Sequence, residues 1–127
     1  MRKLAVMVLA MTFLGVAPGQ SLEKIRTGGA LLKNCEQFDV VARSRDALES
    51  ALACLAYPQG ATDTLWMLSN GGLLPKLCLP PQGLRNDEVR RIYLGWARDN
   101  PDKLDLAPSS AVAFALLAAF PCARLGP

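Results

Sequence analysis

The sequence predicts an all-α protein, a small four- to five-helix domain cross-linked by two disulfides. Hydrophobic residues recur at the three- and four-residue spacings of amphipathic helices, and clusters of Pro and Gly separate these segments. The 127-residue chain also contains four cysteines, an even number, behind an N-terminal segment typical of a secretory signal. No segment has the alternating pattern of a convincing strand.

Residues 1–19 are predicted to be a signal peptide. Two basic residues follow the initiating methionine, residues 4–16 are apolar and uncharged, and Ala17-Pro18-Gly19 offers small residues for cleavage. We expect cleavage after Gly19, because a cut after Ala17 would leave proline at the first mature position. An uncleaved membrane anchor is the alternative, and a lipoprotein is disfavoured because no cysteine ends the apolar run. The mature domain is then residues 20–127.

The charge balance argues against nucleic acid or anionic lipid as the main partner. The signal peptide takes two of the fourteen basic residues with it, which leaves twelve against eleven acids and a net charge of about +1. No later apolar run is long and uncharged enough to span a bilayer. We therefore expect a periplasmic protein without stable membrane insertion after cleavage.

Two N-terminal helices are predicted from capping residues and apolar spacing. Thr27 is a candidate N-cap for a short helix that carries Leu31 and Cys35, although two glycines directly after Thr27 weaken its start. Ser44 can cap a second helix, with leucines at positions i, i+4 and i+7. Pro58 either ends or kinks this helix, because its ring opposes the carbonyl four residues before it.

A long loop and two further helices follow. The segment from Asn70 to Gly83 is rich in Gly and Pro and is the clearest loop. The third helix is predicted from about Asn86 to Arg98, and Asn100-Pro101 breaks it. Its buried stripe is expected at Val89, Ile92, Tyr93 and Trp96, and its solvated face at Arg90, Arg91 and Arg98.

The fourth helix is expected to start near Asp105 and to end at Pro121. Its residues from Ser109 to Phe120 are almost wholly apolar, which predicts a helix buried on all sides. Two interpretations remain: a central core helix, or a core helix that also lends a face to a homodimer.

The cysteines are expected to form disulfides and not a zinc site, because their wide spacing lacks the close pairs of zinc ligands. We predict the pairs Cys35–Cys54 and Cys78–Cys122. The first would clamp the first two helices together, and the second would tie the Pro-rich loop to the end of the fourth. Two other connectivities stay open.

Catalytic chemistry is not expected. The chain contains no histidine, which excludes Ser-His-Asp and Cys-His mechanisms and removes the commonest metal ligand. Capping and solvation explain the paired carboxylates more simply than acid–base catalysis. Tyr57 and Trp66 flank the expected bend at Pro58 and are typical of core residues, or of interface anchors. We predict no cofactor and no enzymatic activity.

Taken together, these segments resemble the Rap/Tai family, the immunity proteins that protect bacteria from type VI secretion amidase effectors. The resemblance covers nearly all of the mature chain, and its more specific half runs from Cys78-Leu79-Pro80 to Phe120-Pro121-Cys122. Its other motifs are Thr27-Gly28, Leu31-Leu32, Cys35, Cys54 with Tyr57 and Gly60, Val89 to Leu94, Asn100-Pro101 and Leu106-Ala107. Pro58 departs from the family pattern, in which an apolar helical residue is more usual after the tyrosine.

The resemblance implies a helical periplasmic protein, often a homodimer, that binds and occludes the cleft of a peptidoglycan amidase. Candidate inserting elements are the Asn70–Gly83 loop and the helix break at Asp99 to Asp105. The candidate partner-binding residues from these elements and from the aromatic pair are Tyr57, Trp66, Asn70, Lys76, Asp99 and Asp102. Two alternatives are a periplasmic structural or adaptor protein without an amidase partner, and an acid-stress chaperone switched by carboxylates at strongly acidic pH.

Overall fold

The fold is all-α, as predicted, in a computed structural model that describes residues 25–39 and 44–123. Within these ranges the α-helices are α2 (Gly28–Glu36), α3 (Arg45–Asn70), α4 (Asn86–Asp99) and α5 (Pro108–Ala119), with 3₁₀ turns at Gln37–Asp39 and Pro101–Lys103. The predicted signal peptide at residues 1–19 and its cleavage site lie outside the described residues.

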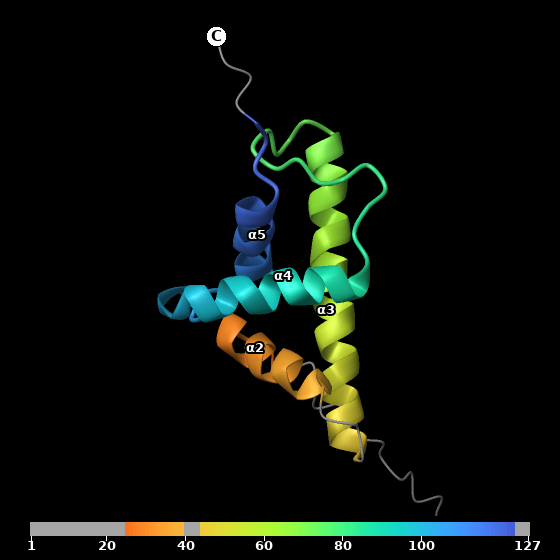
Figure 1. Cartoon of the computed structure of the whole chain (residues 1–127), viewed down its shortest axis with the longest axis vertical. Helices are drawn as coiled ribbons and strands as arrows, with labels where there is room; N and C mark the ends of the chain where they lie inside the picture. Colours follow the sequence, from red (N-terminus) through yellow and green to blue (C-terminus); the bar gives the residue numbers. More distant parts are fainter. Residues whose placement is uncertain (1–24, 40–43, 124–127) are drawn as a thin grey trace, which may run out of the picture.

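Each of the four described helices contacts the other three, and α4 packs most extensively against α3 and α5. Figure 1 shows α4 lying across α3 and α5, with α2 beneath it. The shared core contains aliphatic residues from all four helices together with Tyr93 and the disulfide Cys35–Cys54. A helix with three neighbours buries a wide face, so α4 buries more than the single stripe that its sequence predicts.

The predicted caps of the first two helices are confirmed. The Thr27 side chain accepts a hydrogen bond from Ala30 N at 3.1 Å, and the Ser44 side chain accepts one from Ala47 N at 3.2 Å. Each hydroxyl thus satisfies an amide that the first helical turn leaves without a partner.

Pro58 lies inside α3 and does not end it. The helix continues for 26 residues, about 39 Å at 1.5 Å per residue, and Figure 1 shows it as one continuous element. Proline removes the amide that would bond the carbonyl of Cys54. Cys54 is anchored to α2 by its disulfide, and Thr62 Oγ1 donates to Pro58 O at 2.7 Å. Tertiary anchoring therefore supports the helix where its own ladder is interrupted.

Three details of the predicted C-terminal helices were wrong. Helix α5 begins at Pro108 and not near Asp105, since the preceding carbonyls of Leu104 and Leu106 accept hydrogen bonds from the start of α2. Proline suits this first position because the amide it lacks has no helical partner there. Helix α5 is also not buried on all sides: Phe114 is 48% exposed. Its ring stacks on Trp96 with centroids 6.4 Å apart.

The third correction concerns α4. Arg90, predicted on the solvated face, is only 5% exposed, whereas Arg91 and Arg98 are exposed as expected. Val89 and Tyr93 are buried as predicted, and the other members of the predicted stripe, Ile92 and Trp96, are half-buried.

Candidate functional site

The segment that connects α3 to α4 forms one wall of a cleft. Figure 1 shows residues 71–85 crossing from the end of α3 to the end of α5 and returning along α3 to α4. The segment is fastened to the end of α5, where Cys78 N donates to Phe120 O and Cys122 N donates to Lys76 O, both at 3.0 Å. The disulfide Cys78–Cys122 reinforces this contact.

The cleft between this segment and α3 has a volume of about 300 Å³. From α3 it is lined by Gln59, Thr62, Asp63 and Trp66, and from the segment by Leu79 and residues 81–84. The four α3 residues fall at i, i+3, i+4 and i+7, which places them on one helical face.

A left-handed turn shapes the outer wall of the cleft. Gly83 has φ of +77°, a conformation that residues with a Cβ rarely adopt. Its amide donates to Pro80 O at 2.9 Å, which closes a turn through the two prolines. The turn returns the chain toward α3 and toward the start of α4.

The polar groups of α3 in the cleft are mainly acceptors. Gln59 Nε2 donates to Asp63 Oδ1 at 2.8 Å, which fixes the orientation of this amide. Gln59 Oε1 is buried and has no hydrogen-bond partner within the described part of the chain. An unsatisfied buried acceptor costs about 1–3 kcal/mol, and this oxygen is closed to solvent behind the wall of the cleft.

The six candidate partner-binding residues do not form one site. Trp66 lines the cleft and is 38% exposed. Asn70 and Lys76 are exposed near the same end of the molecule, where α3 ends and the connecting segment begins. Asp99 and Asp102 are exposed at the far end of α4, a helix of 14 residues that spans about 21 Å.

Tyr57 and the helix break have roles in packing. Tyr57 is half-buried against the hydrophobic core. The break at Asp99 to Asp105 receives the start of α2, because Gly28 N donates to Leu106 O and Gly29 N to Leu104 O, each at 2.9 Å. Of the two predicted inserting elements, the connecting segment alone borders the cleft.

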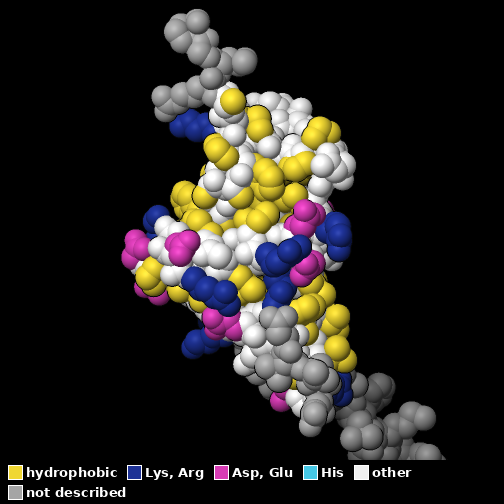
Figure 2. Space-filling model, viewed as in Figure 1, with side chains coloured by type: hydrophobic (Ala, Val, Ile, Leu, Met, Phe, Trp, Pro, Cys, Tyr) yellow, Lys and Arg dark blue, Asp and Glu magenta, His cyan; other side chains and the backbone are white. Residues whose placement is uncertain are grey.

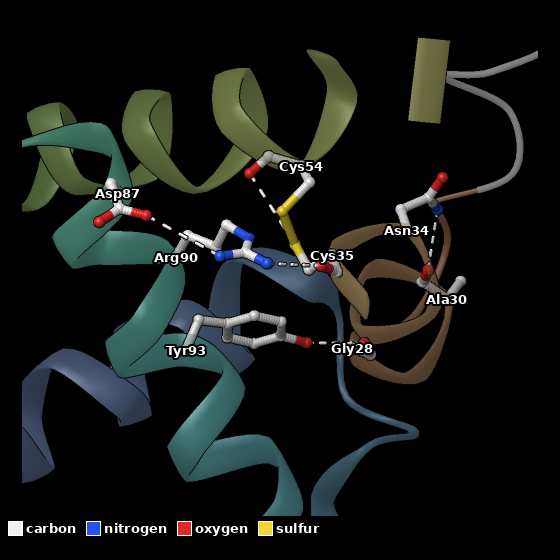
Figure 3. Close-up of a disulfide and its surroundings, with 8 residues drawn as sticks. All are labelled: Gly28, Ala30, Asn34, Cys35, Cys54, Asp87, Arg90 and Tyr93. Carbon is white, nitrogen blue, oxygen red and sulfur yellow. Dashed lines mark hydrogen bonds and ion pairs between the residues drawn. A yellow bond between two sulfur atoms is a disulfide. The ribbon is translucent and has the colours of Figure 1, made fainter. Parts of the chain in front are cut away.

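A second polar cluster joins α2 to α4 around the disulfide Cys35–Cys54 (Figure 3). The Tyr93 hydroxyl donates to Gly28 O at 2.6 Å, and burial raises the pKa of this phenol above its usual value. Cys35 Sγ lies 3.9 Å from Cys54 O. Since a disulfide sulfur carries no hydrogen, this last approach is a contact and not a hydrogen bond.

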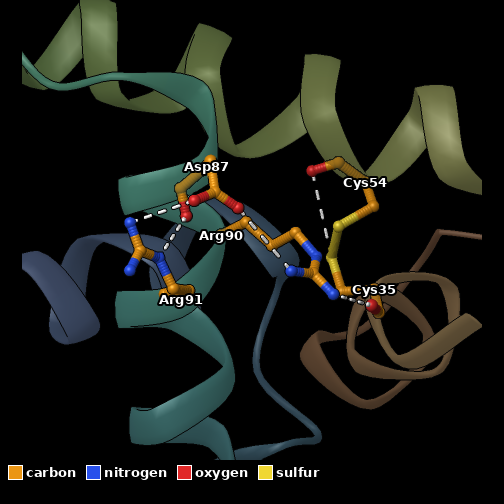
Figure 4. Close-up of polar contacts among 5 residues, drawn as sticks. All are labelled: Cys35, Cys54, Asp87, Arg90 and Arg91. Carbon is orange, nitrogen blue, oxygen red and sulfur yellow. Dashed lines mark hydrogen bonds and ion pairs between the residues drawn. A yellow bond between two sulfur atoms is a disulfide. The ribbon is translucent and has the colours of Figure 1, made fainter. Parts of the chain in front are cut away.

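Arg90 completes this cluster from α4 (Figure 4). Its Nη2 donates to Cys35 O at 3.3 Å, and its guanidinium lies 4.3 Å from the centroid of the Phe38 ring. Asp87 Oδ1 lies 3.8 Å from Arg90 Nη1, while Asp87 Oδ2 pairs with the exposed Arg91 at 3.0 Å. Because these contacts hold helices together, we assign the cluster a structural role.

Sequence reasoning missed Gln59, Thr62 and Asp63 as cleft residues. Their spacing with Trp66 is that of one helical face and could have indicated a shared surface. Pro58 directly before this pattern made the end of a helix an equally reasonable prediction. The described residues contain no group of three or more His, Cys, Asp or Glu side chains able to hold a metal ion. None of the described helices is long and apolar enough to cross a membrane.

One comparison with known proteins gives a match. The family model of the Rap1a immunity proteins matches residues 27–122, from the N-cap of α2 to the last cysteine. No curated protein and no solved structure gives a significant match to the chain. The matched range contains all the described helices, both disulfides and the cleft.

Proposed function

This chain belongs to the family of Rap1a immunity proteins, and on that premise we propose that it is a periplasmic immunity protein that binds and occludes a peptidoglycan amidase effector of type VI secretion. The observation that carries the proposal is the family match over residues 27–122. The family indicates an effector as protein partner. That the effector is an amidase and that binding takes place in the periplasm are further parts of the proposal.

Both disulfides support the proposed compartment. Structural disulfides persist in oxidising compartments such as the periplasm and are rare in a reducing cytosol. Under a chain-entropy model, cross-links with sequence separations of 19 and 44 stabilise by about 3 and 4 kcal/mol. These contributions matter for a small domain whose total stability is about 5–15 kcal/mol.

Occlusion needs no catalytic group from the inhibitor. It requires a surface that is rigid before binding, because ordering a loop at the interface would subtract from affinity. The connecting segment meets this requirement through its disulfide and its backbone hydrogen bonds to the end of α5. We therefore place the effector-binding surface at this segment and the adjoining face of α3.

An inhibition assay tests the proposal. The purified, disulfide-bonded protein is mixed with a peptidoglycan amidase effector of type VI secretion from the same organism, and release of peptide from isolated peptidoglycan is measured. We expect inhibition to be complete at a stoichiometric ratio, with a stable complex on size-exclusion chromatography. An amidase that stays fully active, with no complex at micromolar concentrations, would contradict the proposal and favour the adaptor alternative.

We also propose a homodimer that uses the exposed face of α5. Phe114 on α5 is 48% exposed, and aromatic residues are enriched in the cores of protein interfaces. Sedimentation equilibrium of the wild type and Phe114→Asp is the test. A wild type that is monomeric at tens of micromolar would rule the dimer out.

A further inference from the structure

The charge in the lining of the cleft beside α3 is of one sign. Among the described residues that line it there is one carboxylate, that of Asp63, and no lysine or arginine. Figure 2 shows Lys and Arg side chains interspersed with Asp and Glu side chains at the level of α4 on the face it views, and mainly hydrophobic side chains above them. The cleft therefore has a negative charge without a cationic residue in its own lining.

The hydrogen-bonding groups of the α3 wall call for a donor. Thr62 Oγ1 gives its hydrogen to Pro58 O, so its remaining capacity is as an acceptor. Gln59 gives an amide hydrogen to Asp63 Oδ1, which leaves the second carboxylate oxygen of Asp63 to accept from a ligand. A ligand that brings several N–H groups and a positive charge would complement this carboxylate and the Thr62 hydroxyl.

The apolar lining narrows the choice among cationic ligands. Trp66 offers an indole ring, the aromatic surface that attracts cations most strongly. Leu79 and Leu84 offer surface to an aliphatic stem. Arginine combines a stem, a planar cation that stacks on aromatic rings and five donors that match carboxylate geometry.

We propose that this cleft binds an arginine side chain that projects from the effector. The assignment rests on the proposed function for the identity of the partner, and on the cleft itself for the chemistry. The guanidinium would pair with Asp63 and lie against Trp66, while its stem contacts the leucines of the connecting segment. An arginine anchor in a cleft of this kind is a typical source of specificity at a protein interface.

A direct test uses a small probe and needs no effector. The ¹⁵N-labelled protein is titrated with N-acetyl-arginine methylamide, and the indole N–H resonances of the two tryptophans are followed, assigned with Trp66→Phe. We expect a saturable shift at Trp66 in the millimolar range and none at Trp96, which lies on α4 against Phe114. The neutral citrulline analogue should cause no saturable shift, and Asp63→Asn should abolish the arginine effect. Equal shifts at both indoles, or equal responses to arginine and citrulline, would overturn the proposal.

The effector complex provides the second test. Asp63→Asn should weaken binding by tenfold or more, whereas Asp46→Asn, which removes the same charge from the first turn of α3, should change it less than twofold. Equal effects of the two variants would overturn the proposal, even if the wild type inhibits the amidase. A wild-type protein that binds the arginine probe but no amidase would instead refute the proposed function and leave the chemistry of the cleft established.

Discussion

The two ends of the molecule use the same covalent link in different surroundings. Cys35 and Cys54 are both fully buried where α2 meets α3. At the other end, Cys78 is exposed and Cys122 half-buried where the connecting segment meets α5. The Cα atoms of each pair are 4.9 Å apart, so the disulfides differ in what surrounds them and not in their reach.

Because of this difference, the buried end is suited to stabilising the fold and the exposed end to binding a partner. At the α2 junction, the Arg90 guanidinium and the Tyr93 hydroxyl donate to backbone carbonyls, and the backbone of α2 is in contact with the break after α4. At the other end, one disulfide, a few backbone hydrogen bonds and the buried side chain of Leu77 hold the connecting segment beside an open cleft. We expect the first region to govern the free energy of unfolding and the second to govern partner recognition.

Reduction under native conditions should give the largest contrast between the two ends. Attack on Cys78–Cys122 needs little opening, whereas exposure of Cys35–Cys54 requires unfolding of the core. We expect the first bond to be reduced at least about a hundredfold faster, since global unfolding costs about 5 kcal/mol or more. Alkylation and peptide mapping of the one-disulfide intermediate would show which bond is reduced first. An intermediate that retains Cys78–Cys122 would contradict the expected difference between the two ends.

Two leucines provide a matched pair of truncations. Leu31 in α2 is fully buried, whereas Leu73 in the connecting segment is 70% exposed. Leu31→Ala should lower the free energy of unfolding by about 3 kcal/mol, because it leaves a cavity in the core. Leu73→Ala should change it by less than about 0.5 kcal/mol. Urea denaturation measures both, and similar losses would contradict the assignment of stability to the α2 junction.

Two neighbouring arginines of α4 allow a buried side chain to be compared with an exposed one. Arg90→Ala should cost about 2–3 kcal/mol, since it leaves the buried Cys35 carbonyl without this donor and removes the stem packed on Phe38. Arg91→Ala removes an exposed ion pair with Asp87 and a long, exposed hydrogen bond from Arg91 Nε to Asp87 O, and it should cost less than about 0.5 kcal/mol. Thermal unfolding of the two variants tests this difference. Equal melting temperatures would mean that Arg90 contributes no more to stability than an arginine on the solvated face.

Two glycines should respond to alanine with opposite signs. A Cβ at Gly28 would lie 3.0 Å from Ala111 Cβ and 3.4 Å from Leu104 O. Gly28→Ala should therefore destabilise by about 1–2 kcal/mol through overpacking. A Cβ at Gly60 meets nothing within 4 Å, so Gly60→Ala should stabilise α3 by about 0.5–1 kcal/mol. Stabilisation by both substitutions would show that α2 docks less closely than described.

The smallest effect concerns Tyr93 and has a pH signature. Tyr93→Phe should cost about 1 kcal/mol at neutral pH, because it removes the hydrogen bond to Gly28 O. Burial raises the pKa of Tyr93 in the folded state, whereas an unfolded tyrosine ionises near pH 10. Above that pH the unfolded state alone releases this proton, so stability falls as pH rises, by up to about 1.4 kcal/mol per pH unit.

Urea denaturation at pH 9 and pH 11 tests this signature. The decline between the two pH values should be shallower in Tyr93→Phe than in the wild type. Identical declines would mean that Tyr93 ionises in the folded state as readily as in the unfolded chain.

Local sequence features were good predictors where one helical turn or one covalent bond decides the outcome. Thr27 and Ser44 cap their helices as predicted, because capping involves only the next three residues. The predicted pairing of the four cysteines is confirmed as well, although their spacing alone left two other connectivities open. Pro58 could not be decided locally, because its cost is offset by a disulfide to another helix.

Periodicity and local hydrogen bonding were enough to predict the helical class and the caps, whereas the spacing of the cysteines left two other disulfide connectivities open. The burial of Arg90, the close approach of α2 to α5 at Gly28 and the position of Gln59 and Asp63 in a cleft emerge only when the helices pack together. The physical reason is that burial and close approach depend on which elements meet. In this protein α4 packs against α2, α3 and α5, and the connecting segment folds back onto α3. The spacing of residues along a single helix does not encode either of these contacts.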